Sequence, residues 1–198
     1  MSIFTKKKYL KVSDEKLMQK IQLGDSVAFD VLYERYSKRL LIFFFKAFGG
    51  DEQKAQDFLQ DIFLKIIEKA GLFNPEKNFA TWIFTIAYNL TKNEYRRMDV
   101  RKIMDYETGL EKFPEASVAG DFKDVDSKID HINFQKALFD ELKLVGEDHR
   151  LTFLLRFQQN HSIREISEIM NCSEGTVKSR LFYTTKKLAQ KLNAYNPY

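Results

Sequence analysis

Apolar residues recur every three or four positions along much of this chain, the spacing that places side chains on one face of an α-helix. Ala28, Leu32, Tyr36 and Leu40 illustrate it, since each lies about one turn from the next. The period is absent only from a stretch near the middle of the chain. The predicted helical segments span residues 13–25, 26–50, 51–73, 78–97, 131–145, 147–157 and 162–192.

Residues that begin and end helices stand at the expected places. Ser13 can cap the first helix, because its hydroxyl accepts a hydrogen bond from a free backbone N–H group. Gly24 would end that helix, and the pair Gly49–Gly50 would end the next one. With 8 Gly and 3 Pro among 198 residues, few positions interrupt the helices. The sequence therefore predicts an all-α protein.

The segment "SIREISEIMNCSEGTVKSRLFYTTKKL" (162–188) predicts two helices joined by a tight turn. Ser162 and Glu165 form the S-x-x-E capping box that starts the first helix. Asn171 suits a left-handed backbone in the turn, and Ser173 can cap the second helix. The two buried faces would comprise Ile163, Ile166 and Ile169 or Met170, then Val177, Leu181, Leu188 and Leu192.

The second of these helices has the character of a DNA-recognition helix. Between Gly175 and Leu192 it carries five basic residues and no acidic one. In a major groove its polar side chains could contact base edges while Lys and Arg bind phosphates. The residues that project away from the buried face are Lys178, Ser179, Phe182, Tyr183 and Lys186. An amphipathic helical hairpin with a solvated basic face is the alternative interpretation.

The segment 78–97 predicts a second surface for nucleic acid. Its buried face would comprise Phe79, Ile83, Ile86, Ala87 and Leu90, with Trp82 beside it as a core residue. The other side combines aromatic, carboxamide and basic groups, which suit exposed bases on a phosphate backbone. These side chains belong to Tyr88, Asn89, Lys92, Tyr95, Arg96 and Arg97. An ordinary core helix with a solvated far side would show much of the same pattern.

Charge and composition divide the chain into three parts. Residues 1–97 carry 17 Lys and Arg against 12 Asp and Glu, and residues 131–198 carry 10 against 7. Residues 98–130 reverse the balance, with 5 against 9, and contain Gly109, Pro114 and Gly120. We therefore expect two small helical domains, 1–97 and 131–198, joined by a flexible acidic linker, 98–130. A long surface loop within one domain is the alternative.

Several classes of protein are disfavoured. One cysteine and three scattered histidines make no zinc pattern, and no metal or other cofactor is expected. Asp57 and Asp61 lie one turn apart, but no His and no Gly-rich phosphate loop accompanies them, so we expect no enzyme. No apolar run approaches the roughly 20 residues that span a bilayer, and the N-terminal segment lacks the apolar stretch of a signal peptide. A cytoplasmic protein is expected.

Three motifs in order resemble a known family. "DFLQDIFLKI", "FATWIFTIAYNLTKNEYRR" and "SIREISEIMNCSEGTVKSRL" together resemble the extracytoplasmic-function sigma factors of bacterial RNA polymerase, in the sigma-70 family. The resemblance covers roughly residues 13–97 and 131–192. It implies a sigma region 2 domain and a sigma region 4 domain, and a factor that directs core polymerase to promoters and opens the minus-ten element.

The resemblance also assigns residues to partners. It implies polymerase contacts, on the clamp helices of the largest subunit, for Asp57, Gln60 and Asp61. It implies minus-ten contacts for Tyr88, Asn89, Lys92, Arg96 and Arg97, with Asn89 holding a flipped-out base. It implies minus-thirty-five contacts for Lys178, Ser179, Arg180, Phe182, Tyr183 and Lys186.

The implied partners are core RNA polymerase, through its clamp helices and flap region, and promoter DNA. An anti-sigma factor is a candidate, although nothing in the sequence identifies one. Tyr183 stands where the family often has an arginine, and this departure bears on which promoter is preferred. Two other functions remain open: a stand-alone helix-turn-helix regulator of duplex operators, and a helical adaptor that docks on polymerase without recognising DNA.

Overall fold

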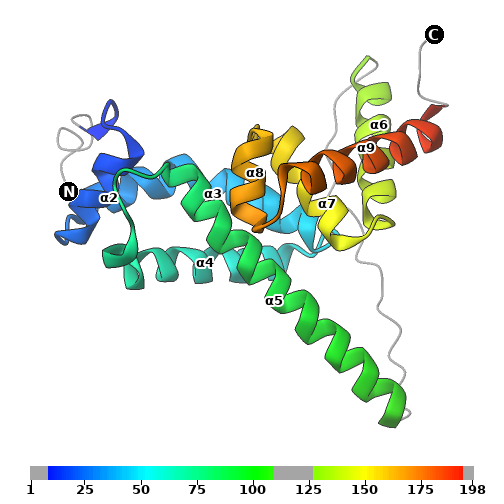
Figure 1. Cartoon of the computed structure of the whole chain (residues 1–198), viewed down its shortest axis with the longest axis horizontal. Coiled ribbons are helices and arrows are strands. Elements are labelled where there is room, and N and C mark those ends of the chain that lie inside the picture. The colour runs from blue at the N-terminus through cyan, green and yellow to red at the C-terminus, as the bar shows by residue number, and fades with distance from the viewer. Residues whose placement is uncertain (1–8, 109–126, 194–198) are drawn as a thin grey trace.

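The computed structural model describes residues 9–108 and 127–193, and every regular element within these ranges is helical (Figure 1). The N-terminal half contains α2 (Asp14–Gln22), α3 (Ser26–Ala47), α4 (Glu52–Glu68), the short 3-10 turn η1 (Ala70–Leu72) and α5 (Phe79–Thr108). The C-terminal half contains α6 (Ser127–Lys143), α7 (Glu147–Phe153), the π-turn η2 (Leu154–Gln158), α8 (Ile163–Met170) and α9 (Glu174–Lys191). The all-α prediction is confirmed.

The first helices begin and end where the sequence indicates. Ser13 Oγ accepts the backbone N–H of Lys16 at the start of α2. Gly24, after α2, and Gly49 and Gly50, after α3, adopt the positive φ that favours glycine. These turns return the chain so that α2, α3, α4 and the first part of α5 surround one core.

Phenylalanine fills much of that core. Phe43, Phe44, Phe79 and Phe84 are fully buried, and the rings of Phe43 and Phe84 meet edge to face with centroids 5.7 Å apart. Ala28, Leu32, Tyr36 and Leu40 of α3 are also buried, as their spacing predicts. Trp82 is half-buried against Phe73 and Phe79.

The helix-turn-helix confirms its sequence signals in detail. Ser162 Oγ accepts the N–H of Glu165 at 3.2 Å, and the Ser162 N–H donates to Glu165 Oε2 at 2.7 Å, which completes the capping box. Asn171 ends α8 in the left-handed conformation, with φ of 48°. Ser173 Oγ then accepts the N–H of Thr176 at the start of α9. Both predicted apolar faces point inward, with Ile163 and Leu181 at their half-buried edges.

The two halves pack directly on each other. Leu151, Ile166 and Val177 belong to the same apolar cluster as the core of the N-terminal half, and α8 lies along α5 (Figure 1). Arg39 and Gln159 exchange hydrogen bonds across this junction: Arg39 Nε donates to Gln159 Oε1 at 3.2 Å, and Gln159 Nε2 donates to the Arg39 carbonyl at 3.3 Å. The domains expected from composition therefore meet face to face.

The central segment is partly helical. α5 continues to Thr108, beyond the predicted end at residue 97, and its last turns project away from the other described helices (Figure 1). α6 begins at Ser127, so the predicted linker of residues 98–130 is helical over 98–108 and 127–130. The remainder of that linker, 109–126, lies outside the described residues.

His161 lies buried in the junction between the halves, with 3% of its surface exposed. Its ring meets Phe84 of α5 edge to face at 4.9 Å, and its Nδ1 lies 3.9 Å from Glu165 Oε2. Burial lowers the pKa of His161 below its ordinary value, and the charge of Arg39 acts in the same direction against that of Glu165. His161 Nε2 has no hydrogen-bond partner among the described residues.

We expect the folded chain to lose stability as the pH falls below about 6.5, the ordinary pKa of histidine. The unfolded chain binds a proton on His161 more readily than the folded chain, so acid favours unfolding, by at most about 1.4 kcal/mol per pH unit. Replacing His161 with Phe should remove this part of the pH dependence, because an apolar ring can keep the Phe84 contact. Urea unfolding of the wild type and of His161→Phe between pH 7.5 and 5.5 measures how the free energy of unfolding changes with pH. Identical slopes of this free energy against pH in the two proteins would contradict the role given to His161.

Candidate polymerase and nucleic-acid interfaces

The three residues predicted to dock on polymerase share one exposed face of α4. Asp57, Gln60 and Asp61 are all exposed, and among the described residues none of them forms a hydrogen bond or ion pair. Ile62 and Ile66 lie on the opposite, buried side of the helix. Ile67 follows the buried Ile66 in sequence, but it is 53% exposed and, with Leu64, continues the Asp57–Asp61 surface along the helix.

The residues predicted to contact the minus-ten element divide into two sets on α5. Asn89, Arg96 and Arg97 are exposed on its outer side. Tyr88 is only 9% exposed, and Lys92 turns toward α7. Tyr95, on the same inner side, is buried; its hydroxyl donates to the Ala47 carbonyl at 2.7 Å and accepts from Arg150 Nη2 at 2.9 Å. The structure therefore leaves part of the predicted nucleic-acid surface accessible and buries the rest in the junction.

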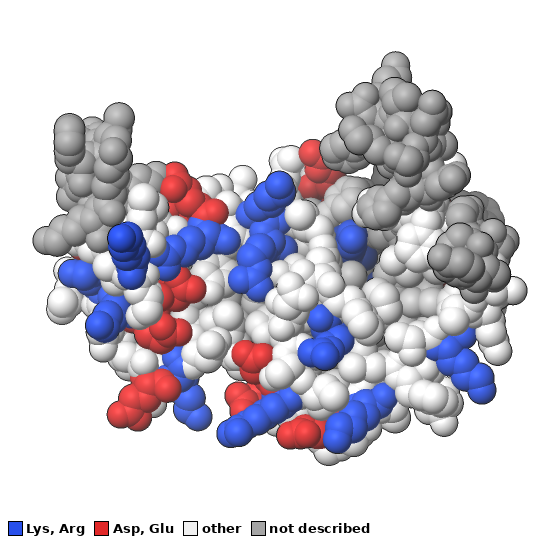
Figure 2. Space-filling model, turned by 90° about the horizontal axis from the view of Figure 1, so that it is seen from above, with Lys and Arg blue, Asp and Glu red and all other residues white. Residues whose placement is uncertain are grey.

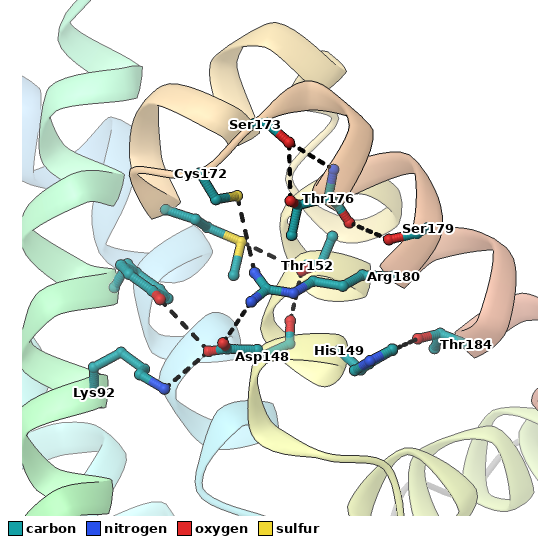
Figure 3. Close-up of polar contacts among 12 residues, drawn as sticks. Lys92, Asp148, His149, Thr152, Cys172, Ser173, Thr176, Ser179, Arg180 and Thr184 are labelled. Carbon is teal, nitrogen blue, oxygen red and sulfur yellow. Dashed lines mark hydrogen bonds and ion pairs between the residues drawn. The ribbon is translucent and has the colours of Figure 1, made fainter.

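Asp148, in the first turn of α7, gathers three predicted DNA-binding side chains (Figure 3). Its Oδ1 lies 2.9 Å from Lys92 Nζ and 3.5 Å from the Tyr88 hydroxyl, and its Oδ2 lies 2.7 Å from Arg180 Nη2. Lys92 and Tyr88 belong to the minus-ten set and Arg180 to the minus-thirty-five set. One carboxylate thus links the two predicted promoter-binding helices, α5 and α9.

The electrostatics of this cluster favour the ionised carboxylate. Burial alone would raise the pKa of Asp148, but the hydrogen bond from Lys92 and the charge of Arg180 outweigh it and lower that pKa. Burial, together with the nearby Asp148 charge, raises the pKa of Tyr88 to about 12. At neutral pH the cluster therefore holds one anion between two cations and a neutral phenol.

The outer face of α9 presents the remaining residues predicted for the minus-thirty-five element. Lys178, Ser179 and Lys186 are exposed. Phe182 and Tyr183 are 60% and 62% exposed, and their rings pack edge to face with centroids 5.5 Å apart. Arg180 differs from these five, since it points inward to Asp148 and only 19% of its side chain is exposed.

The surface charge is mixed. Figure 2 shows Lys and Arg interspersed with Asp and Glu on the face seen from above, without one continuous basic area. Within residues 9–108 and 127–193 no group of His, Cys, Asp and Glu could hold a metal ion. No helix in this described part is long and apolar enough to cross a membrane.

The role of Asp148 is not apparent from the sequence. Acidic residues are common in the first turn of a helix, where they interact favourably with the helix dipole, and Glu147–Asp148 fits that ordinary role. Nothing in the local sequence distinguishes a carboxylate that faces solvent from one that faces another domain.

Comparisons with known proteins match both halves separately. The family model for sigma-70 region 2 matches residues 32–100, and the model for sigma-70 region 4 matches residues 146–188. The chain is 30% identical over 184 residues to an RNA polymerase sigma-H factor of Pseudomonas aeruginosa, which covers 90% of this chain and 93% of that protein. It is 27% identical over 184 residues to an ECF RNA polymerase sigma-E factor of Haemophilus influenzae, with 91% and 96% covered.

Two solved structures share the fold. One is the sigma factor RpoE in complex with the anti-sigma factor NepR from Bartonella quintana, with a TM-score of 0.67, 22% identity and 83% of this chain and 96% of that chain covered. The other is CnrH in complex with the cytosolic domain of CnrY, with a TM-score of 0.66, 21% identity and 91% and 97% covered. Motif order, fold and sequence similarity agree, and this chain belongs to the extracytoplasmic-function branch of the sigma-70 family of RNA polymerase sigma factors.

Proposed function

We propose that the chain is a bacterial transcription initiation factor that binds core RNA polymerase, directs it to specific promoters and opens the minus-ten element. The observation that carries the proposal is the presence of both sigma regions, in order, in one chain whose relatives are sigma factors over nearly their whole length. The chain itself performs no covalent chemistry in this proposal. It acts in the cytoplasm, where polymerase and promoter DNA are found.

Each proposed role has a surface that supports it. The exposed face of α4 at Asp57, Gln60 and Asp61 would dock on the clamp helices of the largest polymerase subunit. Asn89 on α5 would hold a flipped base of the minus-ten strand, with Arg96 and Arg97 near phosphates. Flipping a base out of the stack costs a few kcal/mol, so melting depends on such contacts and on the binding area that core polymerase adds.

The outer face of α9 would contact the minus-thirty-five element. Region 4 would also meet the flap of polymerase. The exposed Phe182–Tyr183 pair offers apolar contact to a thymine methyl where a basic group would bind phosphate. The presence of Tyr183 where the family often has an arginine supports a promoter preference that differs from that of other family members.

We expect Lys178→Ala to change the minus-thirty-five preference or affinity by about 1–3 kcal/mol if Lys178 reads a base. If Lys178 binds only a phosphate, the sequence preference stays and the salt dependence of binding falls by roughly one counterion. Binding of the holoenzyme to a library of minus-thirty-five sequences at several salt concentrations separates the two. Lys191→Ala, at the far end of α9, is the matched control. No change in preference, affinity or salt dependence would remove Lys178 from the interface.

Transcription with purified core polymerase tests the proposed function. The template is a library of promoters randomised at both elements, and the transcripts are sequenced. The proposal expects a consensus at both elements that core polymerase alone does not produce. A stand-alone regulator would bind a duplex site tightly without core and yield no such transcripts. An adaptor would bind core without any salt-sensitive DNA binding by the holoenzyme.

The family also supports an anti-sigma factor as a partner. Both structurally similar proteins described above were solved in complexes, one with an anti-sigma factor and one with the cytosolic domain of CnrY. We propose that a protein of this class restrains the chain.

A further inference from the structure

The packing of the two halves conceals side chains from both proposed promoter contacts. Tyr88 is nearly inaccessible, and 25% of the Lys92 side chain and 19% of the Arg180 side chain are exposed. All three converge on the single carboxylate of Asp148, which comes from α7 and lies between α5 and α9 (Figure 3). DNA cannot use these groups while the carboxylate holds them.

The chemistry of the cluster is that of a phosphate site. A lysine ammonium, an arginine guanidinium and a phenol hydroxyl are the donors that bind a phosphate oxygen in nucleic-acid complexes. Asp148 supplies the anionic oxygens in the closed chain. Lys92 and Tyr88 belong to the N-terminal half and Asp148 to the C-terminal half, so these two contacts tie the halves together. The contact of Asp148 with Arg180 lies within the C-terminal half and orients the carboxylate.

We propose that Asp148 is an internal phosphate mimic that latches region 4 onto region 2, so that the free factor is latent and opening it releases the promoter-binding groups Tyr88 and Lys92 of α5. The proposal rests on the proposed function for the identity of the DNA that is excluded. The latch itself is a property of the free chain and can be tested without a promoter.

Asp148 is the part of the junction that couples closure to DNA binding. The other contacts across it, Arg39 with Gln159, Tyr95 with Arg150 and Phe84 with His161, add packing and hydrogen bonds and hold no cation predicted to bind the promoter. They set how stable the closed form is. The Asp148 contacts with Lys92 and Tyr88 decide which α5 groups have to be released before DNA can use them, and the ion pair with Lys92 is partly exposed and open to competition by salt and by phosphate.

The first test measures closure by energy transfer between two fluorophores. The single native cysteine is replaced by Cys172→Ser, and labelling cysteines are introduced at the exposed positions Lys69, after α4, and Lys191, at the end of α9. Asp148→Asn keeps the size of the side chain and removes its charge. Asp148→Glu keeps the charge. The control is Asp140→Asn on α6, which removes an exposed carboxylate of region 4 whose ion pair among the described residues is the local one with Lys143.

The proposal expects Asp148→Asn to raise the open population about three- to tenfold, with Asp148→Glu between it and the wild type, and Asp140→Asn unchanged. Added salt should open the wild type more than Asp148→Asn. Circular dichroism verifies that each variant remains helical. Equal energy transfer in the wild type and Asp148→Asn across the salt range would overturn the latch.

The second test measures binding of a fluorescent single-stranded DNA of random sequence to the free chain. Affinity should rise about three- to tenfold in Asp148→Asn, because a larger fraction of the chain is competent to bind, and clearly less in Asp140→Asn, which makes the same change in net charge. Equal gains in the two variants would show a bulk charge effect and overturn the proposal. Neither test requires transcription. If Asp148→Asn opens the chain but the wild type directs no transcripts with core polymerase, the proposed function is refuted and the latch is not.

Discussion

Replacing Asp61 with lysine should abolish the co-purification of core RNA polymerase with this chain. Asp61 is exposed on α4 beside Asp57 and Gln60 and pairs with no described residue. The substitution changes the local charge by two units at the centre of the face proposed to meet the clamp helices. Placing a like charge against a partner surface costs several kcal/mol, so we expect a loss in affinity of at least about a hundredfold.

A pull-down of purified core polymerase by the tagged chain measures this loss, and Glu76→Lys is the matched control. Glu76 is an exposed acid in the turn before α5, so the control makes the same charge change away from α4. Wild-type recovery of polymerase by Asp61→Lys would remove Asp61 from the docking surface. Equal losses in both variants would point to net charge and not to the α4 face.

Local signals in the sequence predicted the helices well. Capping by Ser13, Ser162 and Ser173, and the left-handed turn at Asn171, depend on neighbouring residues alone, and all four are as expected. Such features are encoded within one turn of chain, which is why a sequence pattern can identify them.

The extension of α5 was not predictable in the same way. Val100, Ile103 and Met104 are more than half exposed, and the residues between them are exposed as well. A helix that buries no face over this stretch has no reason to keep an apolar period, and the period is the signal on which the prediction depended. Ile67 is an opposite case, an apolar residue that is exposed although its helix buries one face. It follows the buried Ile66 in sequence, but the helix turns it outward.

The closed junction also could not be predicted from the sequence. The contacts of Asp148 join residues 56 and 32 positions away in the chain, and the pair Arg39–Gln159 is separated by 120 positions. A pattern that groups residues along one helix assigns Tyr88 and Lys92 to the same surface as Arg96. Tertiary packing divides that set, because the flank of α5 that carries Tyr88 and Lys92 faces α7.

Asn89→Ala should lower open-complex formation about 10- to 100-fold while leaving the binding of core polymerase unchanged. Asn89 is exposed on the outer side of α5, away from the Asp148 junction and on a different helix from Asp61, so its loss should disturb neither closure nor docking. Its carboxamide can donate to and accept from one base edge, and loss of such a paired contact costs about 1–3 kcal/mol. Because that contact would form only when the base has left the stack, its removal should affect melting and not the initial encounter.

The measurement is the fluorescence of a 2-aminopurine placed in the minus-ten element, followed in the holoenzyme alongside a pull-down of core. Asn93→Ala is the matched control, since Asn93 is the same residue type, exposed one turn further along α5. The control should melt the promoter nearly as well as the wild type. Equal losses of melting and of core binding in Asn89→Ala would mean that the residue supports the domain as a whole, and wild-type melting would mean that another side chain of α5 receives the base. A selective loss of melting would locate the strand-separating contact on the outer face of α5, opposite the flank that carries Tyr88 and Lys92 into the Asp148 junction.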